Sequence, residues 1–96
     1  MATLHLVNHS PARSDALAAC LAVLRPGDGL LLFEDGVLAA LHADLRDLPA
    51  DIRLFALDAD ARARGLAARL DERIERVDHA GFVAACAAHE RVVSWA

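Results

Sequence analysis

The hydrophobic residues of this chain fall into two kinds of segment that alternate from one end to the other. Short runs of consecutive apolar residues, bounded by Gly, Pro or charged residues, have the length and flanks of buried β-strands. In the segments between them, apolar residues recur three and four positions apart, which places their side chains on one face of a helix. We predict strands at residues 4–8, 30–33, 52–57, 74–77 and 91–95.

The first predicted helix covers residues 14–24 and follows a Ser10-Pro11 turn. Ser14 or Asp15 is a suitable N-cap, because either side chain can accept a hydrogen bond from a free amide of the first turn. Pro26-Gly27-Asp28 ends this helix. Its apolar face has the spacing i, i+3, i+4 and i+7 and consists of Leu17, Cys20, Leu21 and Leu24.

A short apolar helix is predicted to follow the Glu34-Asp35-Gly36 turn and to run through Val37, Leu38 and Leu41. The polar segment 44–51, which contains Pro49, is expected to be a connection without helical structure.

Two helices are predicted in the second half of the chain. Asp58 or Asp60 is expected to cap the third helix, and Gly65 to end it in the left-handed conformation. Residues 66–72 are then a loop. Asp78 is expected to cap the last helix, whose apolar positions are Phe82, Val83, Cys86 and Ala87.

Strands that alternate with helices of this size favour parallel pairing with right-handed crossovers. We therefore predict the α/β class, a three-layer α/β/α sandwich around a five-stranded, mainly parallel sheet. Residues 1–96 are expected to form a single domain, because the chain is short and no linker divides it.

The composition adds two expectations about partners. Hydrophobic residues make up 56% of the chain, above the ~45–50% usual for soluble domains, although alanine supplies much of the excess. So much apolar surface on a short chain suggests a partner that covers part of it. The formal net charge of -4 argues against direct nucleic-acid binding, which requires a basic stripe.

Arginines do cluster in the second half of the chain, but acidic residues are interleaved with them, so we interpret this segment as a solvated surface of ion pairs. The clustered arginines are Arg62, Arg64, Arg69, Arg73 and Arg76.

We expect neither a signal peptide nor a membrane span, because no charged leader is followed by a long apolar run. Two widely spaced cysteines make neither a disulfide framework nor a zinc site. The simplest location is the cytoplasm, with both thiols reduced.

The sequence carries no motif of a nucleotide or metal site. The first strand is followed by Asn8-His9-Ser10 rather than by a glycine-rich fingerprint, and there is no Walker sequence. Asp35-Gly36 precedes a helix N-terminus, which attracts anions, but the Glu34-Asp35 carboxylates oppose this and favour a plain turn. The five histidines lack metal-ligand spacing. We therefore expect no cofactor and no metal ion.

Three side chains remain as candidates for chemistry. His9 lies at the carboxyl end of the first strand, where open α/β sheets place their ligands. Cys20 is a potential nucleophile, but it lies more than a turn into its helix and on the apolar face, so a buried structural cysteine is favoured. A Cys20–His9 pair for nucleophilic catalysis is a further option. Cys86 lies on an apolar face and favours packing.

The order of the segments resembles the DsrH/TusB family, the small subunits of intracellular sulfur-relay complexes. The resemblance covers almost all of the chain, and no single piece of it is specific. His79 is a departure, since a tyrosine often stands there in the family. The matching pieces are Leu4-His5, Ser10-Pro11, Asp15 with Leu17, Gly27-Asp28, Asp35-Gly36-Val37, Ala39-Ala40, Ala56-Leu57 with Asp60, Ala63-Arg64-Gly65-Leu66, Val77-Asp78, Phe82-Val83 and Trp95.

This resemblance implies a heterohexamer with homologous subunits of the DsrE/TusD and DsrF/TusC types, which passes sulfur as a cysteine persulfide to a downstream acceptor protein. The principal sulfur-carrying cysteine belongs to the DsrE/TusD-type subunit. Cys20 matches a first-helix cysteine of DsrH-like members and is therefore a possible secondary persulfide acceptor, whereas Cys86 matches no family cysteine. The protein is then an accessory or non-catalytic subunit of a sulfurtransferase complex.

Several functions stay open at this point. The resemblance favours 2-thiolation of the tRNA wobble uridine, with dissimilatory sulfur oxidation as the alternative within the family. A free-standing ligand-binding α/β module that uses the Asn8-His9-Ser10 and Asp35-Gly36 turns belongs to a different class. A stand-alone cysteine hydrolase is the weakest hypothesis, because no catalytic triad is identifiable.

Overall fold

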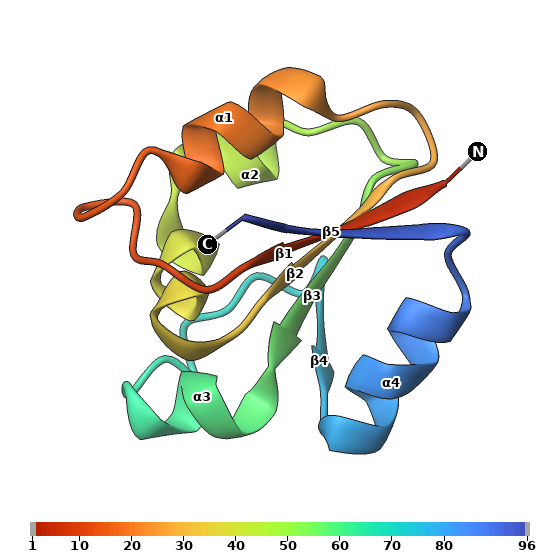
Figure 1. Cartoon of the computed structure of the whole chain (residues 1–96). Coiled ribbons are helices and arrows are strands. Elements are labelled where there is room, and N and C mark those ends of the chain that lie inside the picture. The colour runs from red at the N-terminus through yellow and green to blue at the C-terminus, as the bar shows by residue number, and fades with distance from the viewer. Residues whose placement is uncertain (1, 96) are drawn as a thin grey trace.

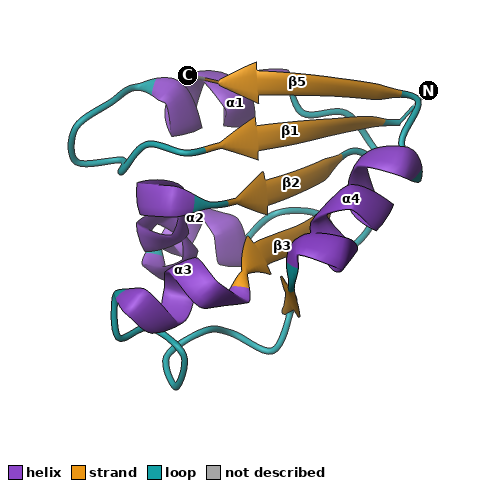
Figure 2. Ribbon diagram, turned by 60° about the horizontal axis from the view of Figure 1, so that its bottom comes forward, coloured by secondary structure: helices purple, strands orange, loops and turns teal. Residues whose placement is uncertain are grey.

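The computed structural model describes residues 2–95, and its centre is a sheet of five parallel strands. The strands lie in the order β4-β3-β2-β1-β5, and Figure 2 shows them side by side with their arrows in one direction. The predicted fold class is confirmed. The strands are β1 (Thr3–Val7), β2 (Gly29–Leu32), β3 (Arg53–Leu57), β4 (Ile74–Val77) and β5 (Arg91–Trp95).

Helices cover both faces of this sheet. Figure 1 shows α1 and α2 on one side of the strands and α4 on the other. Two separate clusters of buried side chains fill the two interfaces, one with Cys20 of α1 and one with Ala85 of α4. The three-layer arrangement is therefore as predicted. The helices are α1 (Ala16–Val23), the 3-10 helix η1 (Glu34–Leu41), α2 (Ala43–Arg46), α3 (Asp58–Ala63) and α4 (His79–Ala87).

The chain changes direction across the sheet once. Strands β1 to β4 lie next to one another in sequence order, and the α4 connection then returns the chain to β5, which pairs with β1. Because every strand is parallel, all the turns that follow strands lie at one edge of the sheet and all the turns that precede strands lie at the other. The sheet therefore has a carboxyl edge, with the turn after β1, and an amino edge, with the starts of β1 and β5.

Burial along the strands follows the sequence pattern. All four residues of β2 are buried, as expected of a continuous apolar run in the middle of a parallel sheet. Glu75 and Arg76 of the edge strand β4 are exposed, as their charge predicts. The other edge strand, β5, has no fully buried residue among Arg91–Trp95.

Three of the predicted helix ends are supported by their local geometry. The Asp78 side chain accepts a hydrogen bond from the Gly81 amide at 2.8 Å and so caps α4. Gly65 has a φ of +70°, the left-handed conformation expected after a helix. At the start of α1 the Ser14 hydroxyl accepts the Ala16 amide at 3.1 Å, while Asp15 occupies the N-cap position without a side-chain hydrogen bond.

The prediction of a connection at residues 44–51 is wrong for residues 44–46, because α2 covers Ala43–Arg46. The His42 ring accepts a hydrogen bond from the Asp44 amide and caps the first turn. The Arg73 guanidinium donates to backbone carbonyls in the last turn of α2 and in the segment that follows it. Its backbone oxygen partners are those of Leu45, Arg46, Leu48, Pro49 and Ile52. A side chain more than 20 residues away in sequence therefore holds a segment that looks like plain loop.

The predicted cap of α3 is also wrong. The N-cap position is Leu57, and no side chain caps the helix. Asp58 is the first helical residue, and Asp60 accepts a hydrogen bond from the amide of Glu34 instead. Asp60, which the sequence predicts as a cap of α3, thus binds the backbone of the turn after β2 instead.

Candidate functional site

Cys20 lies on the face of α1 that packs against the sheet, and none of its surface is exposed. The burial favoured by the apolar spacing is confirmed. Burial, with a smaller contribution from the charge of Asp28, raises the pKa of the Cys20 thiol to about 12. The group is therefore protonated at neutral pH, and the thiolate is the form that attacks sulfur. Its role as a secondary persulfide acceptor stays a prediction, and it requires a conformation in which α1 moves.

Cys86 lies on α4, on the opposite face of the sheet. It is partly exposed and packs at the edge of the cluster that contains Phe55 and Val77. Both cysteines are free thiols. Because the sheet separates them, the two side chains do not form a pair.

The turn after β1 leaves His9 exposed but buries Ser10. His9 is exposed at the carboxyl edge, as its position after the strand predicts. Ser10 is buried, and its hydroxyl accepts a hydrogen bond from the Ala12 amide at 3.2 Å. No hydrogen bond joins His9 to Cys20 within residues 2–95, so the structure does not bring the proposed nucleophile and base together.

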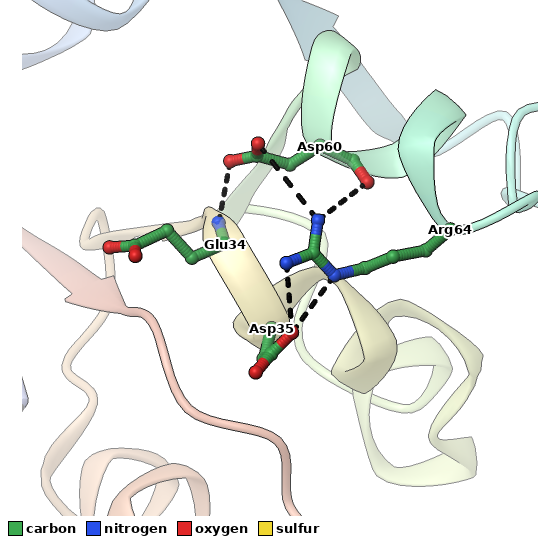
Figure 3. A network of polar contacts seen from close by, with 4 residues as sticks. All are labelled: Glu34, Asp35, Asp60 and Arg64. Atoms are coloured by element: carbon green, nitrogen blue, oxygen red, sulfur yellow. Dashed lines mark hydrogen bonds and ion pairs between the residues drawn. The ribbon is translucent and has the colours of Figure 1, made fainter.

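At the Asp35-Gly36 turn, Asp35 forms an ion pair with Arg64 of the same chain (Figure 3). The Arg64 Nη2 and Nε atoms lie 2.8 and 3.0 Å from Asp35 Oδ1, and Arg64 Nη1 donates to the Asp60 carbonyl. The Glu34 amide donates to Asp60 Oδ2 at 2.6 Å, and Glu34 has a φ of +50°. A positive φ is strained for a residue with a side chain. The network holds this turn between β2 and α3. Within it the Arg64 guanidinium is paired with Asp35.

A buried polar chain connects the two ends of the protein, and sequence reasoning did not identify it. The Trp95 indole Nε1 donates to His5 Nδ1 at 3.0 Å, and His5 Nε2 lies 3.0 Å from Asp28 Oδ2. An indole nitrogen can only donate, so Nδ1 of His5 accepts and Nε2 carries the proton that bonds Asp28. This fixes a neutral tautomer of His5. Two features of the sequence could have indicated this polar chain: His5 lies inside an apolar run, and Asp28 lies directly before a strand.

Asp28 is 2% exposed and also accepts the amides of Thr3 and Arg25, each at 3.0 Å. Burial raises its pKa, but the bonds from the two amides and from His5 outweigh this, so the pKa lies below its ordinary value. Its carboxylate therefore joins the start of β1, the loop after α1 and, through His5, the end of β5. This constellation has a structural role, because every member is engaged within the chain.

Within residues 2–95, no three side chains of His, Cys, Asp or Glu gather closely enough to hold a metal ion. None of the helices in the same range has the length and apolar character needed to cross a membrane.

Comparisons with known proteins give a consistent result over nearly the whole chain. The family model described as DsrH like protein matches residues 9–92. Protein TusB of Escherichia coli O81 (strain ED1a) is 38% identical over 97 residues, covering 96% of this chain and 99% of that protein. Protein TusB of Enterobacter sp. (strain 638) gives the same identity and coverage.

A solved structure shares the fold. The crystal structure of the ychN protein from E. coli has a TM-score of 0.71, 18% sequence identity, and covers 98% of this chain and 99% of its own. At this identity the similarity concerns the fold alone. The family model and the relatives go further and confirm the resemblance predicted from the sequence: the chain belongs to the DsrH family of sulfur-relay subunits.

Proposed function

We propose that this protein is the DsrH/TusB-type subunit of a cytoplasmic sulfur-relay complex that passes persulfide sulfur between proteins for 2-thiolation of the tRNA wobble uridine. The observation that carries the proposal is the 38% identity to Protein TusB, which extends over 96% of the chain. Its partners are subunits of the DsrE/TusD and DsrF/TusC types in a heterohexamer, and a downstream acceptor protein receives the sulfur.

The structure supports an assembly role more strongly than a catalytic one. Cys20 is buried and protonated. This agrees with the family resemblance, which implies that the principal sulfur-carrying cysteine belongs to the DsrE/TusD-type subunit. Apolar side chains are exposed on α4 and β5, where Val83 is 66% and Val92 42% accessible. Exposed apolar side chains of this size suit an interface that another subunit covers.

If Cys20 takes part, the step is a thiol–persulfide exchange. The Cys20 thiolate attacks the terminal sulfur of a partner's cysteine persulfide, a new sulfur–sulfur bond forms, and the partner's cysteine leaves as its thiolate. No metal, nucleotide or external oxidant is needed for this balance. The proton of the Cys20 thiol must first leave, which its burial opposes.

The two thiols are expected to differ strongly in reactivity. In the folded protein, iodoacetamide should alkylate Cys86 at least about tenfold faster than Cys20, because the rate follows thiolate fraction and access. Mass spectrometry of digested samples gives both rates, and the difference should vanish in denaturing urea. Equal rates in the native protein would show that α1 opens readily and exposes Cys20.

The acceptor role has its own measurement. The complex is incubated with a sulfur donor, and the mass of each subunit is determined. An adduct of one sulfur atom on this chain that disappears in Cys20→Ser but persists in Cys86→Ser supports the role. If Cys20 carries no sulfur even in the complete complex, the role is excluded and only the assembly function remains.

Assembly is tested by co-expression with the DsrE/TusD-like and DsrF/TusC-like proteins of the same organism. Native mass spectrometry should give a heteromer that contains this chain and both partners. A chain that persistently elutes as a separate species contradicts the proposal. In that case a thermal-shift screen with nucleotides and small anions tests the free-standing ligand-binding module, because a ligand of the native state raises the melting temperature.

A further inference from the structure

A hollow of about 500 Å³ lies at the amino edge of the sheet. It is lined by Thr3, Arg25, Pro26 and Arg91. Figure 2 shows how this edge is built: the starts of β1 and β5 lie side by side, next to the amino terminus. The hollow lies at the opposite end of the strands from the turns with His9 and Asp35, so it is distinct from the sites considered above.

The walls of the hollow are held in place by buried contacts. Thr3 and Arg91 are direct partners in the register of β1 and β5. The Asp28 carboxylate accepts hydrogen bonds from the amides of both Thr3 and Arg25. It therefore fixes the backbone at Arg25 relative to the start of β1. Pro26 restricts the backbone next to Arg25. A site whose backbone is set before a ligand arrives loses less entropy on binding.

The charge of the hollow contrasts with that of the chain. The net charge of the sequence is -4, yet among residues 2–95 the hollow is lined by two arginines and by no acidic residue. Neither Arg25 nor Arg91 forms an ion pair with another residue between 2 and 95. The arginines with acidic partners are Arg53, Arg62, Arg64 and Arg76.

The buried Asp28 carboxylate is not an ion-pair partner of the Arg25 or Arg91 guanidinium. Both oxygens of Asp28 are engaged, one by the Thr3 amide and the other by the Arg25 amide and the His5 ring. The backbone of Arg25 therefore satisfies Asp28, and its guanidinium remains available. Glu90, next to Arg91 in sequence, is not part of the lining.

We propose that this hollow is an oxyanion-binding site that receives carboxylate side chains from an acidic segment of another protein. Guanidinium groups bind carboxylates through paired N–H donors, and both arginines line this hollow. The inference rests on the proposed function for the identity of the partner, a subunit or sulfur acceptor of the relay. The hollow would then be a polar docking point for a partner protein, in addition to the exposed apolar side chains of α4 and β5.

The size and charge of the site favour a protein over a nucleic acid. Phosphate backbones are bound by extended basic stripes with many contacts. Here only two arginines line the hollow, and the net charge of -4 repels a long polyanion as a whole. A short acidic segment needs only one or two carboxylates at the hollow.

The test is a calorimetric titration of the 96-residue chain with a hexaglutamate peptide at low salt. The double variant Arg25→Glu/Arg91→Glu removes the proposed donors and is expected to weaken binding by at least about tenfold. Arg13→Glu is the matched control, since Arg13 is exposed at the opposite edge and the charge change per residue is the same. Arg25→Lys/Arg91→Lys should keep part of the affinity, and far-UV circular dichroism verifies that each variant folds.

Three outcomes overturn the inference: no saturable binding of the peptide by the wild-type chain, equal weakening by Arg13→Glu, or tighter binding of inorganic phosphate or tRNA through the same two arginines. Because the titration contains no relay subunits, a negative result leaves the co-expression result unchanged. Conversely, peptide binding that depends on Arg25 and Arg91 in a chain that fails to assemble would contradict the proposed function alone.

Discussion

Gly36→Ala is expected to destabilise the protein by at least about 3 kcal/mol or to prevent folding, because there is no room for a side chain at this position. A Cβ atom at Gly36 would lie 2.0 Å from the carbonyl oxygen of Val7 and 2.7 Å from its carbonyl carbon. These are backbone atoms at the end of β1, so neither can turn aside as a side chain would. The effect is measured as the shift of the urea unfolding midpoint.

Gly65→Ala is the matched control for this substitution. Gly65 has a φ of +70°, and a Cβ atom there would meet no other atom within 4 Å. Only the left-handed conformation opposes a side chain, which costs about 1 kcal/mol. A Gly36→Ala variant as stable as Gly65→Ala would contradict the close approach of η1 to the end of β1.

Asp28→Asn is expected to lower the free energy of unfolding at pH 7 by about 2–3 kcal/mol, because charge-assisted hydrogen bonds in a buried site are lost. Three donors converge on the Asp28 carboxylate, from Thr3, Arg25 and His5. An amide of the same shape offers one oxygen and places its own donor against one of them. Asp15→Asn is the control, since Asp15 is exposed and makes no capping hydrogen bond.

The effect of Asp28→Asn should depend on pH. The pKa of Asp28 is lowered below its ordinary value of 3.8 in the folded protein. A lowered pKa means that the carboxylate stabilises the fold above that ordinary value and that this contribution is lost as the pH falls through the folded pKa. Urea unfolding at pH 7 and at pH 3 should therefore give a smaller difference between wild type and variant at pH 3. A difference that is the same at both pH values would show that the charge of Asp28 contributes nothing.

The sequence predicted the elements whose causes are local. All five strands are found, because β1, β2 and β3 are apolar runs and β4 and β5 are short segments with clear boundaries. Asp78 caps the helix that follows it, and Gly65 ends the helix that precedes it. The errors come from distant side chains. Arg73 holds the segment after α2, and Asp60 serves the turn at Glu34 rather than its own helix. Such contacts join residues more than 20 positions apart, which periodicity does not reveal.

The candidate site was predictable to a lesser degree. The apolar face of α1 correctly indicated that Cys20 is buried, and His9 lies at the carboxyl end of β1, as predicted. The His5–Asp28–Trp95 chain was not predicted, since it depends on the pairing of β1 with β5 from the far end of the sequence. The arginine-lined hollow was not predicted either, because Arg91 lies beside Thr3 only through the same pairing, while Arg25 reaches the hollow from the loop before β2.

The most direct measurement of the central claim is the 2-thiouridine content of tRNA in an E. coli strain that lacks TusB. Expression of this chain together with the DsrE/TusD-like and DsrF/TusC-like subunits of its own organism is predicted to restore the modified nucleoside. The same partners without this chain should leave the nucleoside absent. A strain that contains the assembled heteromer and still lacks 2-thiouridine would contradict tRNA thiolation and point to the sulfur-oxidation branch of the family.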